Sequence, residues 1–284
     1  MYLIKMSMIN ETAIITGSTS GIGKCIAEKF LAEGCKVTIS SRSEEKVKKT
    51  LTELSKKYKD SVIGFACDVN DPKDLKKLVD KTIEKFGSIR ILIANAGLNI
   101  TYGPFSKLTA DRVNKDAKIV IGTNLIGTLN SISAVLPYMI QQKYGRIITL
   151  SGAGAERPMP NMTIYTASKG GIIAFSKSLA VEFSQMEGDI KINVFSPGML
   201  KTNLGTNIKL VPNWRSEEDH KRDLEIVYKN MAGDIDSSCE KVIPYVLPDL
   251  KDNGKVFRGS SIMKMITGGM KIQREMKRRS KKKE

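Results

Sequence analysis

Short runs of apolar, β-branched residues alternate along this chain with longer stretches of helical periodicity. Such alternation is the pattern of repeated βαβ units, in which each helix returns the chain to the start of the next parallel strand. The sequence predicts strands at residues 12–16, 36–40, 62–66, 91–95, 146–150 and 191–195, with a seventh candidate at 255–259. Because these runs are almost continuously apolar, we expect a parallel sheet that is covered by helices on both faces.

The stretches between the strands predict helices at residues 21–33, 43–59, 72–86, 118–142 and 164–184. We therefore expect a doubly wound, Rossmann-like α/β sheet in a single domain that spans residues 1–270. Ligands of such folds bind beyond the carboxyl ends of the strands. A charged segment at about 203–238 is expected to be an insertion that covers this crevice as a substrate lid. Residues 271–284 are expected to form a flexible basic tail.

Composition excludes several other classes of protein. The chain has one histidine, His220, in a polar segment that predicts a solvated surface residue, so a Ser-His-Asp hydrolase and a multi-histidine metal site are not expected. The four cysteines lack CxxC spacing and indicate reduced, buried side chains of a cytoplasmic protein. No apolar run approaches the roughly 18 residues of a transmembrane helix, and the start does not resemble a signal peptide.

The formal net charge of +16 is high for a soluble domain. Residues 271–284 hold eight basic and two acidic side chains and so contribute +6 of it. Such a tail is typical of segments that contact nucleic acid or an anionic membrane, and equally of a solvated chain end. Polyanion contact therefore stays open at this point.

A glycine-rich turn, "TGSTSGIG" at residues 16–23, follows the first predicted strand and leads directly into the first predicted helix. Glycines allow a tight turn and a close approach of the backbone to a ligand, while the start of a helix offers free N–H groups to a pyrophosphate. This position within a βαβ unit predicts dinucleotide binding.

The spacing of Gly17, Gly21 and Gly23 resembles the TGxxxGxG turn of the short-chain dehydrogenase/reductase family. Further motifs of that family follow in order: "CDV" at 67–69, "NAG" at 95–97, Asn124, Tyr165 with Lys169, and "SPGMLKT" at 196–202. The resemblance covers residues 11–202. It implies an oxidoreductase that transfers hydride between a nicotinamide cofactor and a carbonyl or hydroxyl group.

The resemblance also implies roles for individual residues. Asn124, Ser151, Tyr165 and Lys169 are the expected catalytic residues. The expected cofactor-binding residues are Gly17, Ser18, Ser20, Gly21, Ile22, Gly23, Ser41, Arg42, Asp68, Val69, Asn95, Ala96, Gly97, Tyr165, Lys169, Pro197, Gly198, Leu200 and Thr202. No metal is expected in this set.

The end of the second predicted strand bears on which cofactor binds. An NAD site usually places a carboxylate there, whereas the 2′-phosphate of NADP favours a cation and hydroxyl groups. This chain has Ser40, Ser41 and Arg42, and an arginine matches the geometry of a phosphate. We therefore expect NADP(H), with NAD(H) left open and with Glu44 and Glu45 close enough to compete for the guanidinium.

Tyr165 and Lys169 lie four residues apart on a predicted helix and so share one face. A nearby ammonium lowers the pKa of a phenol, which predicts that Lys169 activates Tyr165 for proton transfer. The family's serine normally stands thirteen residues before the tyrosine, where this chain has Gly152, with Ser151 next to it. Three interpretations follow: Ser151 substitutes, backbone N–H groups or the substrate suffice, or the protein binds cofactor without turnover.

The sequence thus predicts an NADP(H)-preferring oxidoreductase acting on a small, polar substrate. The alternative is a cofactor-sensing binding protein whose basic tail docks on a polyanion. The apolar helices around 118–142 and 164–184 exceed what one sheet face needs, which predicts a homodimer or homotetramer.

Overall fold

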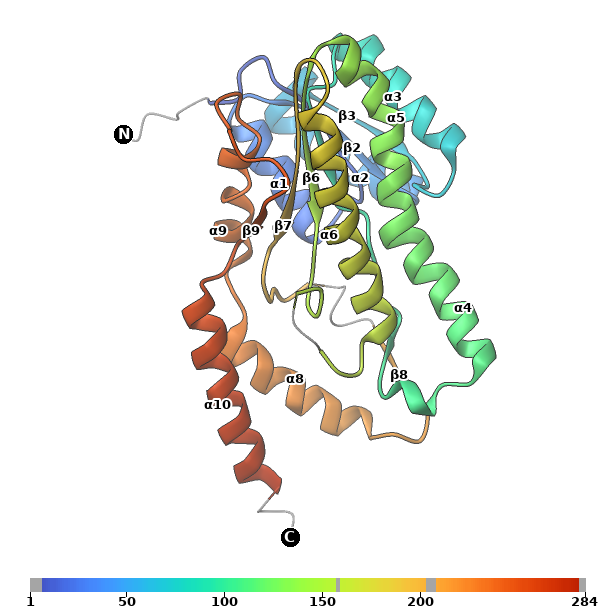
Figure 1. Cartoon of the computed structure of the whole chain (residues 1–284), viewed down its shortest axis with the longest axis vertical. Coiled ribbons are helices and arrows are strands. Elements are labelled where there is room, and N and C mark those ends of the chain that lie inside the picture. Colours follow the sequence, from blue (N-terminus) through green and yellow to red (C-terminus); the bar gives the residue numbers. More distant parts are fainter. Residues whose placement is uncertain (1–6, 157–158, 203–207, 281–284) are drawn as a thin grey trace.

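The computed structural model describes residues 7–156, 159–202 and 208–280, which form one Rossmann-like domain. Its main sheet has seven parallel strands in the order β3-β2-β1-β4-β6-β7-β9 (Figure 1). The strands are β1 (Thr12–Ile15), β2 (Lys36–Ser41), β3 (Val62–Ala66), β4 (Ile91–Ala94), β6 (Tyr144–Leu150), β7 (Asp189–Ser196) and β9 (Val256–Arg258). All seven strand predictions are confirmed. The chain also forms a two-stranded sheet from β5 (Thr101–Tyr102) and β8 (Lys209–Leu210).

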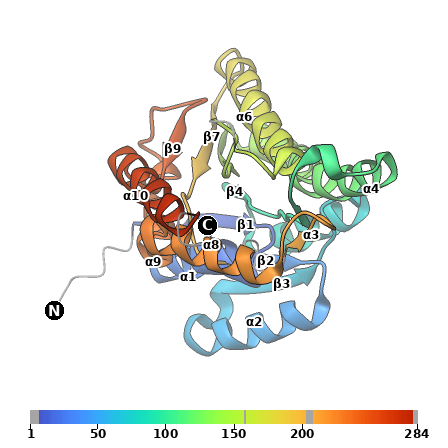
Figure 2. The same ribbon diagram turned by 90° about the horizontal axis from the view of Figure 1, so that it is seen from below.

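Helices cover both faces of the main sheet (Figure 2). They are α1 (Gly21–Ala32), α2 (Glu44–Tyr58), α3 (Pro72–Phe86), α4 (Ala110–Ile121), α5 (Gly127–Gln141), α6 (Thr163–Ser184), α8 (Glu217–Met231), α9 (Ile235–Glu240) and α10 (Ile262–Ser280). One hydrophobic core joins the sheet to α1, α2 and α9, and a second joins it to α3, α5 and α6. All four cysteines are buried free thiols, as predicted.

The helix predicted at 118–142 begins earlier, at Ala110, because Thr109 caps it by accepting a hydrogen bond from the Arg112 amide. It continues from α4 into α5 through a π-helical turn, Gly122–Ile126. By length and composition alone, the span Ala110–Gln141 could cross a membrane, which the sequence analysis did not predict. In the structure 44% of the most apolar 18-residue stretch of this span is buried inside the protein, where α5 packs on α3 and on the sheet.

Helices α8, α9 and α10 were not predicted from the sequence. Helix α10 corrects the expectation that residues 271–284 form a flexible tail. Residues 271–280 continue α10, where a flexible tail was expected, while 281–284 lie outside the described residues. The reason is tertiary: α10 packs along α8, and Arg279 forms ion pairs with Asp219 and Asp223. Of the expected lid, residues 203–207 lie outside the description, and α8 forms most of the rest.

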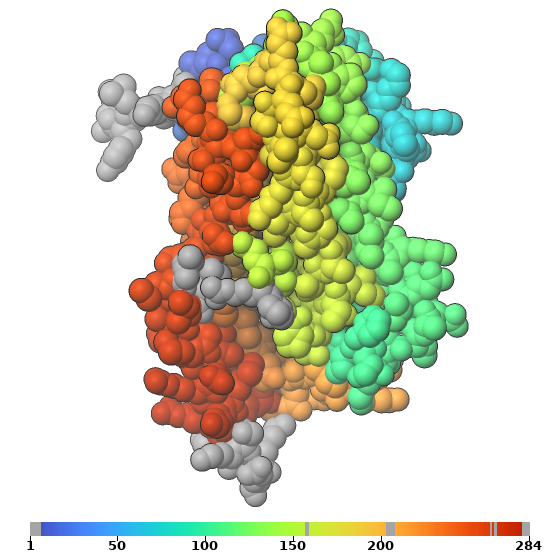
Figure 3. Space-filling model, viewed as in Figure 1, coloured from blue at the N-terminus to red at the C-terminus, as the bar shows by residue number. Residues whose placement is uncertain are grey.

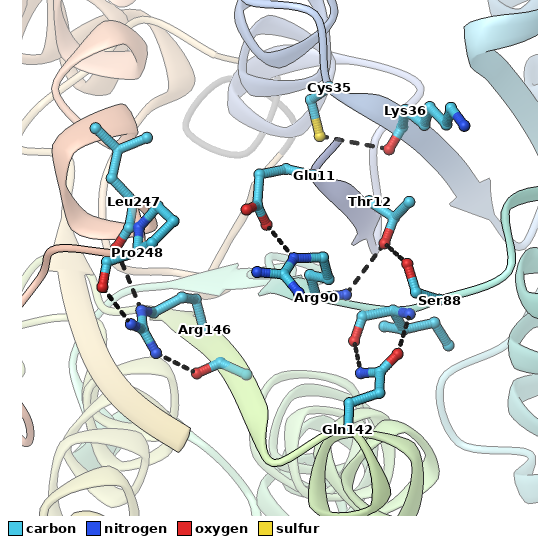
Figure 4. A network of polar contacts seen from close by, with 12 residues as sticks. Glu11, Thr12, Cys35, Lys36, Ser88, Arg90, Gln142, Arg146, Leu247 and Pro248 are labelled. Atoms are coloured by element: carbon cyan, nitrogen blue, oxygen red, sulfur yellow. Dashed lines mark hydrogen bonds and ion pairs between the residues drawn. The ribbon is translucent and has the colours of Figure 1, made fainter. Parts of the chain in front are cut away.

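Two arginines secure the opposite edge of the sheet, where the strands begin (Figure 4). Arg146 is fully buried and donates hydrogen bonds to the carbonyl oxygens of Leu247, at 3.3 Å, and Pro248, at 2.8 Å. Arg90 pairs with Glu11 at 3.0 Å. The Arg146 contacts hold the segment before β9 against β6.

Candidate functional site

The glycine-rich turn lies directly beneath the segment that follows β4. Asn95 donates from Nδ2 to the carbonyl oxygens of Thr16, at 2.8 Å, and Gly17, at 3.0 Å. A Cβ atom at Gly17 would lie 2.9 Å from the Ala96 Cα, and one at Gly23 would lie 2.4 Å from the Asn95 Nδ2. Only glycine therefore fits this packing, and the turn brings the backbone close to the open edge at the carboxyl ends of the strands.

The first turn of α1 offers backbone N–H groups that no side-chain cap occupies. Ser20 is the N-cap residue, yet its exposed side chain makes no capping hydrogen bond. The first N–H groups of a helix lack partners within the helix and carry the positive end of its dipole. A phosphate group would therefore be bound favourably here.

Two cavities lie along this edge. The first, which we call the Arg42 cavity, has a volume of about 260 Å³ and contains seven predicted residues: Gly17, Ser20, Ser41, Arg42, Val69, Ala96 and Gly97. Thr19, Lys46, Cys67, Leu98 and Thr123 also line it and were not predicted. Lys46 lies on the first turn of α2 while Arg42 precedes that helix, so no helical spacing in the sequence linked the two cations.

Arg42 is exposed, and no ion pair of its guanidinium occurs among the described residues. Glu44, which could have competed for it, pairs instead with Lys48 at 2.8 Å. The rim of the Arg42 cavity therefore presents two cations, Arg42 and Lys46, beside the Ser41 hydroxyl.

Ser18 and Asp68, both predicted to bind cofactor, have their side chains occupied within the protein. Ser18 is fully buried, donating from Oγ to the Ile15 carbonyl at 2.6 Å and accepting from the Ser40 amide at 2.9 Å. Asp68 accepts from the Asn70 amide at 2.9 Å and from its Nδ2 at 3.0 Å. Neither lines the cavities described here, so these side chains shape the loops after β1 and β3.

The second cavity, the Tyr165 cavity, has a volume of about 360 Å³ and adjoins the first at Gly97, which lines both. It brings together Ile22, Asn95, Gly97, Ser151, Tyr165, Lys169, Pro197, Gly198, Leu200 and Thr202 from the predicted set. Residues that were not predicted complete it: Tyr102, Leu150, Gly152, Ala153, Met159, Asn161, Met162, Met199, Ile208, Arg215, His220, Asp223, Leu224, Val227, Tyr228 and Met276. Most come from the loops after β6 and β7, from α8 and from α10.

The loop after β7 covers the glycine-rich turn. Gly198 has a φ of +85°, which favours glycine, and the preceding Pro197 carbonyl accepts a hydrogen bond of 2.9 Å from Ser238. Thr202 lies opposite Gly21, where an added Cβ would be 3.8 Å from the Thr202 Cβ. The predicted residues of this loop thus lie across the open edge from α1.

His220 is not the solvated surface residue that the sequence predicted. It lies on α8, lines the Tyr165 cavity and places its ring centroid 4.9 Å from that of Tyr102. Loss of solvent, followed by the nearby Arg215 cation, lowers its pKa. The segment looked solvated because its other charges pair with one another, as Arg215 does with Asp223.

Tyr165 and Lys169 are both buried on the first turns of α6, and their electrostatics differ from the sequence prediction. The Lys169 Nζ donates to the Leu150 carbonyl at 2.8 Å and lies 5.9 Å from the centre of the Tyr165 ring. Burial raises the pKa of Tyr165 to about 12 and lowers that of Lys169 to about 8. The prediction that Lys169 lowers the pKa of the phenol is therefore wrong for this arrangement.

The absent serine leaves room that the tyrosine uses. A Cβ at Gly152 would lie only 2.3 Å from the Tyr165 hydroxyl oxygen, so the phenol rests directly on this glycine. The adjacent Ser151 has a buried Oγ with no hydrogen-bond partner among the described residues. A buried polar atom without a partner calls for an explanation, and binding a ligand is one of them.

Asn124 lies in the π-helical turn and is fully buried. Its Oδ1 accepts from the Leu98 amide at 2.8 Å, and its Nδ2 donates to the Leu98 carbonyl at 2.9 Å and to the Ser168 Oγ at 3.0 Å. Asn124 therefore ties the loop after β4 to α6 beside Lys169. In this structure its side chain is a positioning group.

Comparisons with known proteins agree with this geometry. Residues 11–211 match the sequence model of the short chain dehydrogenase family. Dehydrogenase/reductase SDR family member 4 of Sus scrofa is 33% identical over 194 residues, which cover 68% of this chain and 67% of that protein. Chlorophyll(ide) b reductase NOL of Oryza sativa subsp. japonica is 38% identical over 67% of this chain, which spans 56% of that relative's length. The crystal structure of levodione reductase superposes with a TM-score of 0.77 at 25% identity, covering 93% of this chain and 98% of that one.

Proposed function

Since this chain belongs to the short-chain dehydrogenase/reductase family, we propose that it is an NADP(H)-preferring reductase that acts on a carbonyl group placed beside Tyr165. Membership of the family makes it an NAD(P)-dependent oxidoreductase of CH–OH and C=O groups. When bound, the nicotinamide cofactor supplies or accepts the hydride. The chain's own residues bind and orient the cofactor and the substrate, and they protonate the substrate oxygen.

The glycine-rich turn and the Arg42 cavity fit such a cofactor. Gly17 and Gly23 leave space that any Cβ atom would fill, and the start of α1 favours a pyrophosphate. Arg42, Lys46 and Ser41 together favour a 2′-phosphate, and the planar guanidinium can bind it in a bidentate manner. No carboxylate is among the residues that line this cavity. These contacts support the preference for NADP(H) over NAD(H).

The protonation state of Tyr165 suits the proton-donating step of a reduction. With a pKa of about 12, the phenol stays neutral across the physiological range and can donate its proton to a carbonyl oxygen. Lys169, with a pKa of about 8, remains mostly charged at neutral pH and stabilises negative charge that develops nearby. Ser151 is the hydroxyl nearest in sequence to Gly152, and we assign it the second hydrogen bond to the substrate oxygen.

The cavity walls favour an apolar substrate body over the small polar molecule predicted from the sequence. Met159, Met162, Met199, Ile208, Leu224, Val227 and Met276 all line the Tyr165 cavity. Polar side chains also line it, among them Asn161, His220 and Tyr228, while Arg215 and Asp223 are paired to each other. We therefore propose a carbonyl compound whose body is largely apolar and occupies the part of this cavity that α8 and α10 line, beside the cofactor residues.

The proposed assembly is a homodimer or homotetramer in the cytoplasm. Ile119 on α4, Ile126 in the π-helical turn and Val181 on α6 are exposed apolar side chains on the helices that the sequence assigned to an interface. Light scattering of the purified protein tests this part directly.

The observation that carries the proposal is the buried Tyr165 hydroxyl beside Lys169 in a cavity that adjoins the cation-lined one. The test is oxidation of NADPH or NADH by the purified protein with a panel of cyclic and long-chain ketones and of sugars. Tyr165→Phe should abolish turnover, whereas Tyr138→Phe, on α5, where the hydroxyl donates to Asp80 of α3, should retain it. Turnover that survives Tyr165→Phe would contradict the assigned role.

A second candidate function rests on Gly152, which stands where the family has its serine. Without that donor the protein could bind NADP(H) as a sensor. Tight NADPH binding, with no turnover of any ketone or sugar in the panel, would favour this candidate over the reductase.

A further inference from the structure

Helix α10 forms the outer wall of one end of the molecule, beside α8 (Figures 1 and 3). The two helices pack side by side, and Met276 of α10 reaches the lining of the Tyr165 cavity. The helix begins after β9 and includes the basic segment at the end of the described chain. Its two faces differ in chemistry.

The inner face of α10 is fixed to α8. Gly268 is buried, and a Cβ there would lie 2.7 Å from the Asn230 carbonyl oxygen. Seven residues on, Glu275 bonds to Lys229 and to Asn230, each at 3.3 Å. Arg279 adds its ion pairs with acids of α8. Spacings of seven and four residues place these contacts on one side of the helix.

The outer face carries an apolar stripe over the first turns of the helix. Met263, Ile266 and Met270 are 69%, 46% and 48% exposed. Their spacing of three and four residues aligns them along one line of the helix surface. Large apolar side chains that gather in the open indicate an interaction site.

Basic side chains continue the same face toward the end of the helix. Lys271, Arg274, Lys277 and Arg278 are all exposed, whereas Glu275, the one acidic residue of α10, faces α8. The exposed charges of α8 are balanced, with Glu217, Glu218 and Glu225 against Lys221, Arg222 and Lys229. The positive potential at this end of the molecule therefore comes from α10.

We propose that the outer face of α10 docks on an anionic phospholipid bilayer, with Met263, Ile266 and Met270 inserted among the acyl chains and the basic residues against the headgroups. Helices that lie in a membrane interface combine an apolar face with a Lys/Arg-rich polar surface in this way. A nucleic acid would use the cations and gain nothing from the apolar stripe. A second copy of this chain would bring the same positive charge against itself.

This docking is separate from catalysis and can be measured without turnover. The full-length protein is mixed with vesicles of equal parts phosphatidylcholine and phosphatidylserine, or of phosphatidylcholine alone, and the bound fraction is read by sedimentation. The original protein should bind the mixed vesicles, and added salt should weaken the binding.

Two variants separate the two contributions to the partition coefficient. Changing Met263, Ile266 and Met270 to Ser should lower it at least about tenfold, because the buried apolar surface is lost. Changing Lys271, Arg274 and Arg278 to Gln should lower it about a hundredfold, since each charge contributes roughly fivefold. Matched changes of Ile9, Phe105 and Met186 to Ser, or of Lys49, Lys56 and Lys57 to Gln, should leave binding unchanged.

Several results would overturn the proposal. One is equal recovery of the original protein with both kinds of vesicle or with neither. Another is undiminished binding of the serine variant, which would leave a purely electrostatic contact. Tighter binding to single-stranded DNA than to the mixed vesicles, unaffected by the serine changes, would identify a nucleic-acid surface. A halved particle mass for the serine variant in light scattering would identify a contact between copies.

Discussion

Replacing Gly152 with Ala tests whether Tyr165 reacts from the position that the structure gives it. The added Cβ would lie 2.3 Å from the phenolic oxygen, closer than the 3.0 Å below which real Cβ contacts essentially do not occur. The hydroxyl must therefore move by at least about 0.7 Å, the difference of these two distances. Gly152 does not have a positive φ, so alanine strains no backbone angle there and the effect is purely one of space.

A misplacement of about 1 Å can lower the rate of an enzyme about 100-fold. We therefore expect kcat of Gly152→Ala to fall by about that factor, or about 2.7 kcal/mol of transition-state stabilisation. Steady-state NADPH oxidation measures kcat, and circular dichroism melting verifies that the variant is folded. Because melting reports stability and not the position of one hydroxyl, it separates a displaced phenol from a damaged fold.

The matched control is Gly170→Ala, on the same helix as Tyr165. A Cβ at Gly170 has only the Ala155 carbonyl within reach, at 3.9 Å, which is ordinary contact. This variant should keep the original kcat. If Gly152→Ala turns over as fast as Gly170→Ala, the phenol does not act from its place above Gly152, and the reasoning is refuted.

Three further predictions concern the same edge of the sheet. Ser151→Ala should stabilise the fold by about 1 kcal/mol, because the buried Ser151 hydroxyl has no partner among the described residues. The same change should lower kcat about 10²-fold in an initial-rate assay. Unchanged turnover would instead assign the donor role to the backbone. Arg42→Ala should raise KM for NADPH about tenfold or more and leave KM for NADH alone, and an equal rise for both cofactors would argue against a 2′-phosphate contact. Lys169→Met should abolish turnover and raise the melting temperature at pH 7 by a few degrees, because the folded chain holds this cation at a pKa of about 8 against an ordinary 10.5. Since the unfolded chain binds the extra proton between these two values, the stability of the original protein should gain on that of the methionine variant as pH rises across that window.

The sequence predicted the sheet well because each strand and helix carries a local signal. Residues 91–94 are apolar throughout since they are buried on both faces, and the structure places them in the sheet as β4. The order of motifs along the chain was sufficient to identify the family. Helix α10 was missed, and its second half was expected to be a flexible tail because its basic composition resembles that of a solvated chain end.

The site was predicted in outline and corrected in its electrostatics. Spacing placed Tyr165 and Lys169 on one face of a helix, as the structure confirms, but spacing carries no information about where each polar atom finds a partner. The Leu150 carbonyl, which accepts a hydrogen bond from the Lys169 ammonium, belongs to strand β6 and not to the helix that carries Lys169. His220 was likewise misassigned, because its neighbour Tyr102 lies far away in the sequence.

By itself the sequence determined the parallel sheet and the glycine turn at its open edge, because periodicity and local backbone requirements are encoded in neighbouring residues. Only the tertiary structure decided the rest: the phenol resting on Gly152, the raised pKa of Tyr165, the apolar wall from α8 and α10, and the outward stripe of α10. These depend on desolvation and on contacts between residues distant in sequence, and both arise only when the chain is packed.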